Sequence, residues 1–313
     1  MLNIIFSNPF VIFMFGSILL YYSSELLISN SIALSEKFNV PRFIIGGTII
    51  ALGTSLPEII VSISANIKGN SDVAIGNIVG SNIANLGLIL GISLCFKSFN
   101  INKSNNEYLF NIVSLLFITV VFYINLLNGH FLFVHGCMFL VFYCLYFFIY
   151  IKYFKNEDKL DDIDNNNSFN IIKLILGVIL IYYGSQFFID GALGIAHKIG
   201  MNDIAVGLTI IALGTSAPEL IVSLNAIKKN ESMLVIGNIF GSNIANIVFA
   251  GGIASLIKNI YISHNEIFIF SSIMLFLTIL LSLIMLFSKK IYKIYSLIFT
   301  SVYIIFIYMN FSN

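Results

Sequence analysis

The sequence predicts an all-α integral membrane protein with ten transmembrane helices, arranged as two inverted five-helix repeats. Three observations lead to this fold. The 313 residues are 58% hydrophobic and only 10% charged, whereas soluble domains carry about 25% charged residues. Apolar runs near the roughly 20 residues that a membrane-spanning helix needs recur along the chain. Two polar motifs occur twice, once in each half. Soluble folds are therefore excluded.

Apolar runs between polar breaks predict the individual helices. Each run is apolar throughout, whereas the strands of a membrane barrel would alternate between polar and apolar residues. The ten predicted spans are 8–28, 43–67, 72–96, 108–127, 130–152, 170–190, 204–227, 232–257, 265–288 and 291–310. A polar linker at 153–169 divides a first five-helix repeat (1–152) from a second (170–313).

Basic residues are distributed unevenly between the two sides of this topology. Thirteen of the 16 Lys and Arg residues fall in the loops after spans 1, 3, 5, 7 and 9, and only Lys68, Lys198 and Lys258 fall on the other side. Basic loops stay in the cytoplasm. We therefore expect a plasma-membrane protein with a cytoplasmic linker and both termini outside.

The charge balance also limits the partners. The formal net charge is +1, and the chain lacks the basic patch that nucleic-acid binding requires. The sequence indicates a lipid bilayer as its surroundings, and it gives no sign of nucleic acid, of an obligatory protein partner or of a cofactor.

The internal repeat is carried by polar residues inside the spans. IIALGTSLPE (49–58) recurs as IIALGTSAPE (210–219), and IGNIVGSNIAN (75–85) recurs as IGNIFGSNIAN (236–246). Both pairs share one offset, 219 − 58 = 246 − 85 = 161. Because each half has an odd number of spans, the second copy enters the membrane from the opposite side. Inverted repeats with a site at the midplane are typical of secondary transporters.

Two carboxylates, Glu58 and Glu219, lie near the middle of their spans. A lone carboxylate at that depth costs on the order of 2.5–3.5 kcal/mol on insertion scales, and no Lys or Arg lies at a matching depth. A bound cation is the natural partner for both.

The residues before each glutamate supply further oxygen atoms. Proline removes a helical N–H and crowds the preceding turn, so we expect the helix to open at the GTS sequence and to free the carbonyls of Ala51 and Ala212. Hydroxyl oxygens come from Thr54, Ser55, Thr215 and Ser216.

The second motif adds polar residues at helical spacing. Ser81 and Asn85 lie four residues apart and share one helix face, as do their copies Ser242 and Asn246. Carboxylate, hydroxyl and amide oxygens are ligands that suit Ca2+ or Na+, and the motifs contain no thiolate or imidazole.

The paired GTSxPE and GNxxGSNxxN segments resemble the α-repeats of the cation/Ca2+ exchanger superfamily, specifically its prokaryotic-type Na+/Ca2+ exchanger branch. This resemblance implies an alternating-access antiporter that moves several Na+ inward to expel one Ca2+. It implies that Ca2+ is held by Glu58, Glu219, Thr54 and Thr215. It further implies that the Na+ sites combine these residues with Ser55, Ser216, Ser81, Ser242 and the carbonyls of Ala51 and Ala212.

One position departs from the pattern of many relatives. Prokaryotic and K+-dependent members often carry Asp where this chain has Asn246. An amide supplies an oxygen but no charge, so we expect electrogenic exchange that needs no K+.

Three other functions compete with this hypothesis. A Ca2+/H+ antiporter would use the same two glutamates as proton carriers, although the additional Ser and Thr oxygens favour Na+. A passive cation channel is less consistent with a pseudo-twofold pair inside one chain. An intramembrane enzyme is not indicated, because the sequence contains no HExxH motif, no GxGD motif and no Ser–His pair at matching depth.

Overall fold

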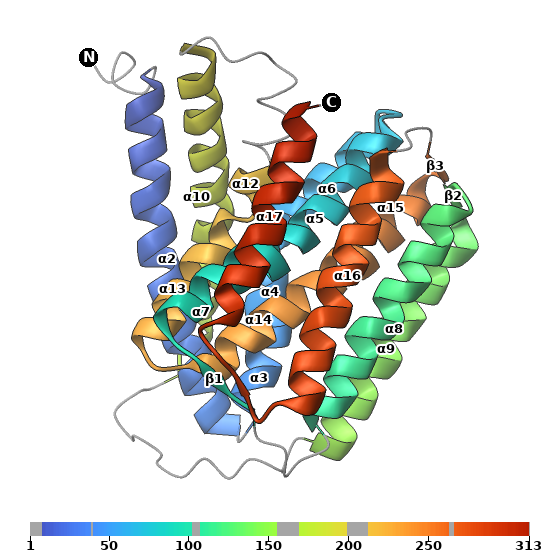
Figure 1. Cartoon of the computed structure of the whole chain (residues 1–313). Coiled ribbons are helices and arrows are strands. Elements are labelled where there is room, and N and C mark those ends of the chain that lie inside the picture. Colours follow the sequence, from blue (N-terminus) through green and yellow to red (C-terminus); the bar gives the residue numbers. More distant parts are fainter. Residues whose placement is uncertain are drawn as a thin grey trace.

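The computed structural model describes residues 8–38, 40–101, 107–154, 169–198, 212–262 and 266–312, and it is mostly helical (Figure 1). Within these ranges seven helices are long and apolar enough to cross a membrane, and a bent helix pair raises the number to eight. The predicted class, a helical membrane protein, is therefore confirmed.

The described part of the first half of the chain is mostly helical and contains two short strands. Its elements are α2 (Pro9–Phe38), α3 (Arg42–Ile45), the π-helix η1 (Gly46–Ile50), α4 (Ala51–Thr54), α5 (Leu56–Ile67), α6 (Ser71–Ile83), the π-helix η2 (Ala84–Ile89), α7 (Leu90–Phe96), β1 (Phe99–Asn100), α8 (Glu107–Leu127), β2 (His130–Phe131) and α9 (Phe133–Phe154).

The second half has a similar succession of elements. They are α10 (Ile171–Lys198), α12 (Ala212–Thr215), α13 (Ala217–Lys228), α14 (Ser232–Ala245), the π-helix η4 (Asn246–Gly251), α15 (Gly252–Ile257), β3 (Ile260–Tyr261), α16 (Glu266–Phe287), β4 (Lys290–Ile291) and α17 (Tyr295–Ser312). The beginning of the predicted span 204–227 and most of the predicted linker lie outside the described residues.

The first helix is longer than predicted. We expected it to end at residue 28, where serines and an asparagine interrupt the apolar run, but α2 continues to Phe38. These side chains bond to the carbonyls of their own helix, as Ser29 does to Glu25 at 2.8 Å and Asn30 to Leu26 at 2.9 Å. Polar residues that are satisfied in this way do not end a helix.

Helices α2 and α10 pack closely and antiparallel to each other. A Cβ atom at Gly16 would collide with the backbone of Phe188, and one at Gly177 would approach the backbone of Leu27. The offset of 161 residues exchanges these two contacts, because it relates residue 16 to 177 and residue 27 to 188. The pair therefore has a local twofold relationship.

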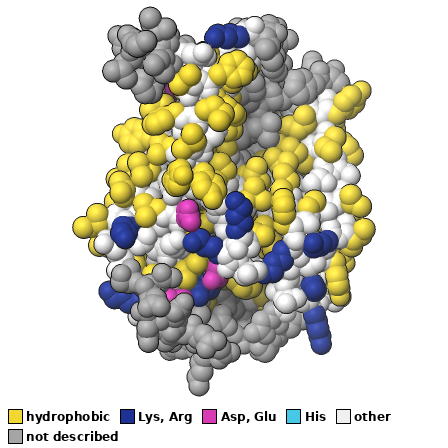
Figure 2. All heavy atoms as spheres, turned by 90° about the vertical axis from the view of Figure 1, so that its left-hand side faces the viewer, with side chains coloured by type: hydrophobic (Ala, Val, Ile, Leu, Met, Phe, Trp, Pro, Cys, Tyr) yellow, Lys and Arg dark blue, Asp and Glu magenta, His cyan; other side chains and the backbone are white. Residues whose placement is uncertain are grey.

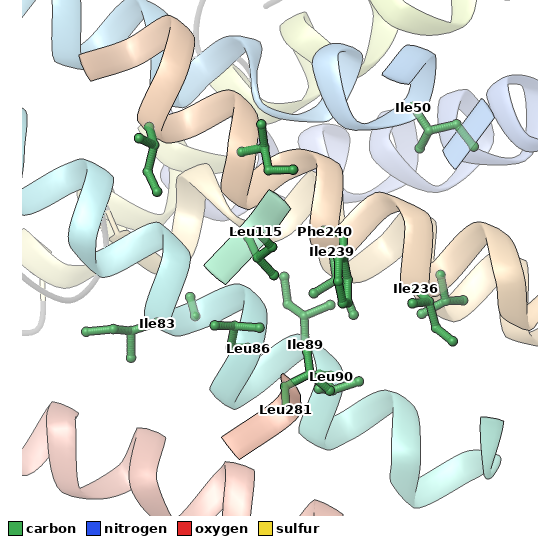
Figure 3. Close-up of a cluster of buried hydrophobic side chains, with 14 of the residues drawn as sticks. Ile50, Ile83, Leu86, Ile89, Leu90, Leu115, Ile236, Ile239, Phe240 and Leu281 are labelled. Carbon is green, nitrogen blue, oxygen red and sulfur yellow. The ribbon is translucent and has the colours of Figure 1, made fainter. Parts of the chain in front are cut away.

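The core forms where the two helices that carry the GSNIAN motif cross. Most of the segment Ser71–Phe96 and most of Ser232–Ile257 are buried inside the protein, whereas only a third or less of the apolar stretch of α2 and of α10 is buried. Figure 3 shows Ile89 pointing toward Ile239 and Phe240 of α14. This apolar packing fixes both polar motifs in the interior.

The surface agrees with a membrane environment. Figure 2 shows hydrophobic side chains over much of the face that α2 and α10 form, with most charged side chains gathered toward its lower part. Two short strand pairs, β1 with β4 and β2 with β3, join loops at opposite ends of the protein (Figure 1). The sequence did not predict these strands.

Candidate ion-binding site

Both copies of the GTSxPE motif interrupt a helix at the serine. Ser55 has φ −83° and ψ 3°, and Ser216 has φ −85° and ψ 2°, so the two breaks have the same geometry. The helix axis bends by 48° at the first break. Pro57 and Pro218 stand in the first turn of the helices that follow, where a missing N–H costs nothing. The break places each glutamate in a first helical turn.

The expected opening of the helix differs in one detail. The Ala51 carbonyl was expected to be free, but it accepts a hydrogen bond from the Ser55 N–H at 2.9 Å and another from Thr54 Oγ1 at 3.2 Å. This expectation was wrong because the break follows Thr54, so the last turn of α4 remains closed. Ala212 begins α12, and its side chain lies outside the described part.

The two carboxylates form reciprocal hydrogen bonds between the halves. Ser55 Oγ donates to Glu219 Oε1 at 2.9 Å, and Ser216 Oγ donates to Glu58 Oε1 at 3.4 Å. Glu58 is 0% exposed and Glu219 is 1% exposed. Among the described residues, the Oε2 atom of each glutamate has no hydrogen-bond partner. Such buried oxygen atoms are costly unless a proton or cation compensates them.

Further hydroxyl groups surround this pair. Thr54 Oγ1 lies 3.5 Å from Ser242 Oγ and 3.3 Å from Asn238 Oδ1, which connects α4 to α14. Thr215 is fully buried. Ser81 is buried as well, and its Oγ has no partner among the described residues. The structure thus keeps the predicted hydroxyls in the interior, and it brings Thr54, Ser55, Ser216 and Ser242 into contact with the opposite repeat.

The two asparagines predicted at the site bind asparagines of the opposite repeat. Asn85 Nδ2 donates to Asn243 Oδ1 at 3.2 Å, and Asn246 Nδ2 donates to Asn82 Oδ1 at 3.0 Å. The Oδ1 atoms of Asn85 and Asn246 are buried and have no partner within the described ranges. Both amides therefore have an oxygen that is available to a ligand.

Sequence reasoning missed a second set of asparagines. Asn77 Nδ2 donates to the main-chain carbonyl of Glu58 at 3.1 Å and to Ser62 Oγ at 2.9 Å. The Oδ1 atom of its repeat mate Asn238 lies 3.3 Å from Thr54 Oγ1. Both stand in the IGN part of the second motif, so their occurrence in both copies was the signal that would have identified them.

The chemistry of the site is that of a hard-cation site. In the described part of the chain, no group of three or more His, Cys, Asp or Glu side chains could hold a metal ion. The available atoms are two carboxylates with neutral hydroxyl and amide oxygens. Oxygen ligands of this kind suit Ca2+, and softer metals prefer sulfur or imidazole.

Comparison with known proteins gives consistent matches. The sequence matches the family described as sodium/calcium exchanger protein over residues 8–152 and 169–312. It is 36% identical over 297 residues to an uncharacterized membrane protein of Methanocaldococcus jannaschii, covering 94% of this chain and 95% of that protein. It is 26% identical over 319 residues to the sodium/calcium exchanger MaX1 of Methanosarcina acetivorans, covering 87% and 89%.

A solved structure shows the same fold. The sodium-calcium exchanger NCX_Mj, soaked with 2.5 mM Na+ and 1 mM Sr2+, matches with a TM-score of 0.83 and 34% identity, covering 95% of this chain and 96% of that chain. Ca2+ and Na+ are the transported substrates of such exchangers. The family match covers both halves of the chain, including both copies of each motif. The chain belongs to the sodium/calcium exchanger family.

Proposed function

We propose that the protein is a secondary antiporter that exchanges Na+ for Ca2+ by alternating access, electrogenically and without K+. The observation that supports this most is the pair of hydrogen bonds that Glu58 and Glu219 each accept from a serine of the opposite repeat. Each carboxylate keeps one buried oxygen without a protein partner. A divalent cation between the repeats would compensate both.

The proposed ligands are the buried oxygens of both motifs. Glu58 and Glu219 supply the charge. The neutral oxygens come from Thr54, Thr215, Ser55, Ser216, Ser81, Ser242, Asn85 and Asn246, each at most 2% exposed. The carbonyl of Ala212 completes the proposed set, whereas that of Ala51 is left out because it already accepts two hydrogen bonds.

The neutral oxygens favour Na+ over H+ as the coupling ion. A proton carrier needs only the two carboxylates, whereas Na+ must be coordinated by several oxygens. The amide oxygens of Asn85 and Asn246 are buried and unpartnered among the described residues, and amides do not titrate. Their presence therefore supports ion coordination over proton exchange.

Charge balance supports electrogenic exchange without K+. Two carboxylates neutralise one Ca2+, and an additional K+ would leave net positive charge in a poorly screened interior. Several Na+ exceed the two carboxylate charges, so neutral oxygens must coordinate the remainder. Exchange of more than two Na+ for one Ca2+ moves net charge across the membrane.

We infer that the chain forms ten spans in two inverted repeats within the plasma membrane. The local twofold of α2 and α10 supports this topology, as do the matching breaks at Ser55 and Ser216. The excess of Lys and Arg in alternate loops supports a cytoplasmic linker and external termini. The ions and the surrounding lipid are the proposed partners, without an obligatory protein partner.

Ca2+ uptake into liposomes tests the function directly. Purified protein is reconstituted into Na+-loaded liposomes, and uptake of radioactive Ca2+ is compared with Na+-free liposomes at the same pH on both sides. We expect uptake only with a Na+ gradient, and loss of uptake in Glu58→Gln and Glu219→Gln. Glu25→Gln is the matched control, because Glu25 lies in a span but is exposed.

The same experiment separates the alternatives. Uptake that follows a pH gradient and ignores Na+ would identify a Ca2+/H+ antiporter. Uptake that continues without any countergradient would identify a passive channel. Normal Na+-driven uptake by both glutamine variants would refute the proposed ligands.

A further inference from the structure

A chain of asparagine hydrogen bonds joins the two helical segments that carry the GSNIAN motif. Asn246 Nδ2 donates to Asn82 Oδ1 at 3.0 Å, and Asn82 Nδ2 donates to the main-chain carbonyl of Asn243 at 3.3 Å. Asn85 Nδ2 donates to Asn243 Oδ1 at 3.2 Å. All four side chains are at most 1% exposed. The network therefore has no contact with bulk water.

The main-chain carbonyl fixes the direction of the bonds. An amide side chain can face a neighbour with either its oxygen or its NH2 group, but a main-chain carbonyl only accepts. Asn82 must therefore direct its NH2 to the carbonyl of Asn243. Its oxygen is then left for Asn246, which must donate. The oxygen of Asn246 consequently remains free, and it has no partner among the described residues.

We propose that Asn82 is a positioning residue, which holds the Asn246 amide so that its oxygen, and not its NH2 group, faces the transported cation. The inference rests on the proposed function, because it needs a cation at this site. Asn246 lies one helical turn after Ser242, whose Oγ is 3.5 Å from Thr54 Oγ1. A reversed amide would direct its positive NH2 group toward the same space.

The two halves differ in this respect. Asn243 accepts from Asn85 through its oxygen, but its own Nδ2 has no partner in the described part of the protein. Asn82 is thus anchored by a hydrogen bond to the main-chain carbonyl of Asn243, whereas the Asn243 side chain has no such bond among the described residues. We expect the loss of Asn82 to weaken cation binding more than the loss of Asn243.

The test measures Ca2+ binding to purified protein by calorimetry, together with the Ca2+ concentration for half-maximal uptake in liposomes. Asn82→Leu keeps a similar volume but removes the acceptor. We expect at least about tenfold weaker Ca2+ binding, as is usual when a residue that orients a ligand is lost. Asn243→Leu should show a smaller loss.

A rescue variant separates positioning from a structural role. A carboxylate has two equivalent oxygens, so Asp at position 246 needs no orientation. Asn82→Leu/Asn246→Asp should therefore bind Ca2+ within about threefold of Asn246→Asp alone, because the two hydrogen-bonded positions are coupled and their effects are not additive. A structural defect at position 82 would persist in the double variant.

The control for added charge is Ser81→Ala with and without Asn246→Asp. The proposal requires that Asp fails to restore this variant to the affinity of Asn246→Asp alone. Equal rescue of both backgrounds, or unchanged binding by Asn82→Leu, would overturn it. Asn82→Ala replaces Asn82→Leu if leucine prevents folding. A wild-type protein that binds Ca2+ but does not exchange it would refute the proposed function and leave this test intact.

Discussion

Ser55 Oγ donates a hydrogen bond to Glu219 Oε1 at 2.9 Å, although 164 residues separate the two in the sequence. The equivalent bond of the other repeat, from Ser216 Oγ to Glu58 Oε1, is longer at 3.4 Å. Each glutamate is therefore bound by the helix break of the other repeat. Neither half of the chain supplies a complete site by itself.

The unequal lengths of these bonds predict unequal effects of removing them. Ser55→Ala should weaken Ca2+ activation of transport by about tenfold or more, because a hydrogen bond to a charged group contributes roughly 1.5–3 kcal/mol. Ser216→Ala should have a smaller effect. The measurement is the Ca2+ concentration for half-maximal uptake in liposomes. A larger effect of Ser216→Ala would contradict the difference.

Transport should not require K+. Asn246 supplies an oxygen without charge, so the site has only the two glutamate charges to balance its cations. Ca2+ uptake into Na+-loaded vesicles should be equal with external K+ or choline when the voltage is clamped by other means. An absolute requirement for K+ would refute this prediction. A K+ requirement that appears in Asn246→Asp would support its electrostatic basis.

The predicted orientation can be tested by labelling of cysteines. In a variant without Cys95, Cys137 and Cys144, a single cysteine at Asn165 should resist an impermeant thiol reagent in intact cells. One at Asn128, which is exposed in the turn after α8, should react. Basic loops are retained in the cytoplasm, so the opposite labelling pattern would mean that the topology is reversed.

The only arginine of the chain connects three helices through ion pairs. Arg42 at the start of α3 lies 3.0 Å from Glu36 of α2 and 3.1 Å from Glu231 before α14. Arg42→Gln leaves two largely buried carboxylates without a counter-charge. We expect it to lower the free energy of unfolding by roughly 2 kcal/mol, between the values for exposed and fully buried pairs. Thermal unfolding in detergent measures this effect, and an unchanged midpoint would contradict it.

The ionisation of Glu231 should make the stability of the protein depend on pH, because this carboxyl group is partly buried. Burial raises the pKa of Glu231 above its ordinary value of 4.5, although Arg42 opposes this shift. The folded protein thus holds this proton more tightly than the unfolded chain. As the pH rises from 4.5 through the folded pKa, ionisation of Glu231 reduces stability.

The Glu231→Gln variant removes this dependence on pH. Its unfolding temperature relative to wild type should be higher at about pH 8 than at about pH 5, because only the wild type pays the cost of ionisation. Glu266→Gln serves as the control, because Glu266 is an exposed glutamate at the start of a helix. A relative stability of Glu231→Gln that falls with rising pH would contradict the assignment.

The sequence predicted the family and most of the residues that meet in the interior, because both are encoded in the repeated motifs. Glu58 and Glu219 could be paired from the offset alone. Their contacts with the serines of the opposite repeat could not, since these depend on how the two halves dock. The number of ten spans and the boundaries of the two repeats stay predictions.

Local hydrogen bonding explains what the sequence did not reveal. The end of α2 was placed ten residues too early, because a serine that bonds to its own helix resembles a loop residue in sequence. The Ala51 carbonyl was expected to be free. The sequence could not show otherwise, because one main-chain hydrogen bond from Ser55 sets the position of the break. The role of Asn82 depends on a carbonyl of the other repeat.

The π-helical turns η2 and η4 follow the two GSN sequences and begin at Ala84 and Asn246. A π-turn is an α-helix that has gained one residue, and each residue of an α-helix turns the chain by about 100°. Because the wide turn spreads this extra residue over the same rotation, the helix after η2 keeps its orientation, and Leu90 and Leu94 remain buried. Each GSN sequence is thus followed by one additional residue that the wide turn absorbs without disturbing the packing of the next helix.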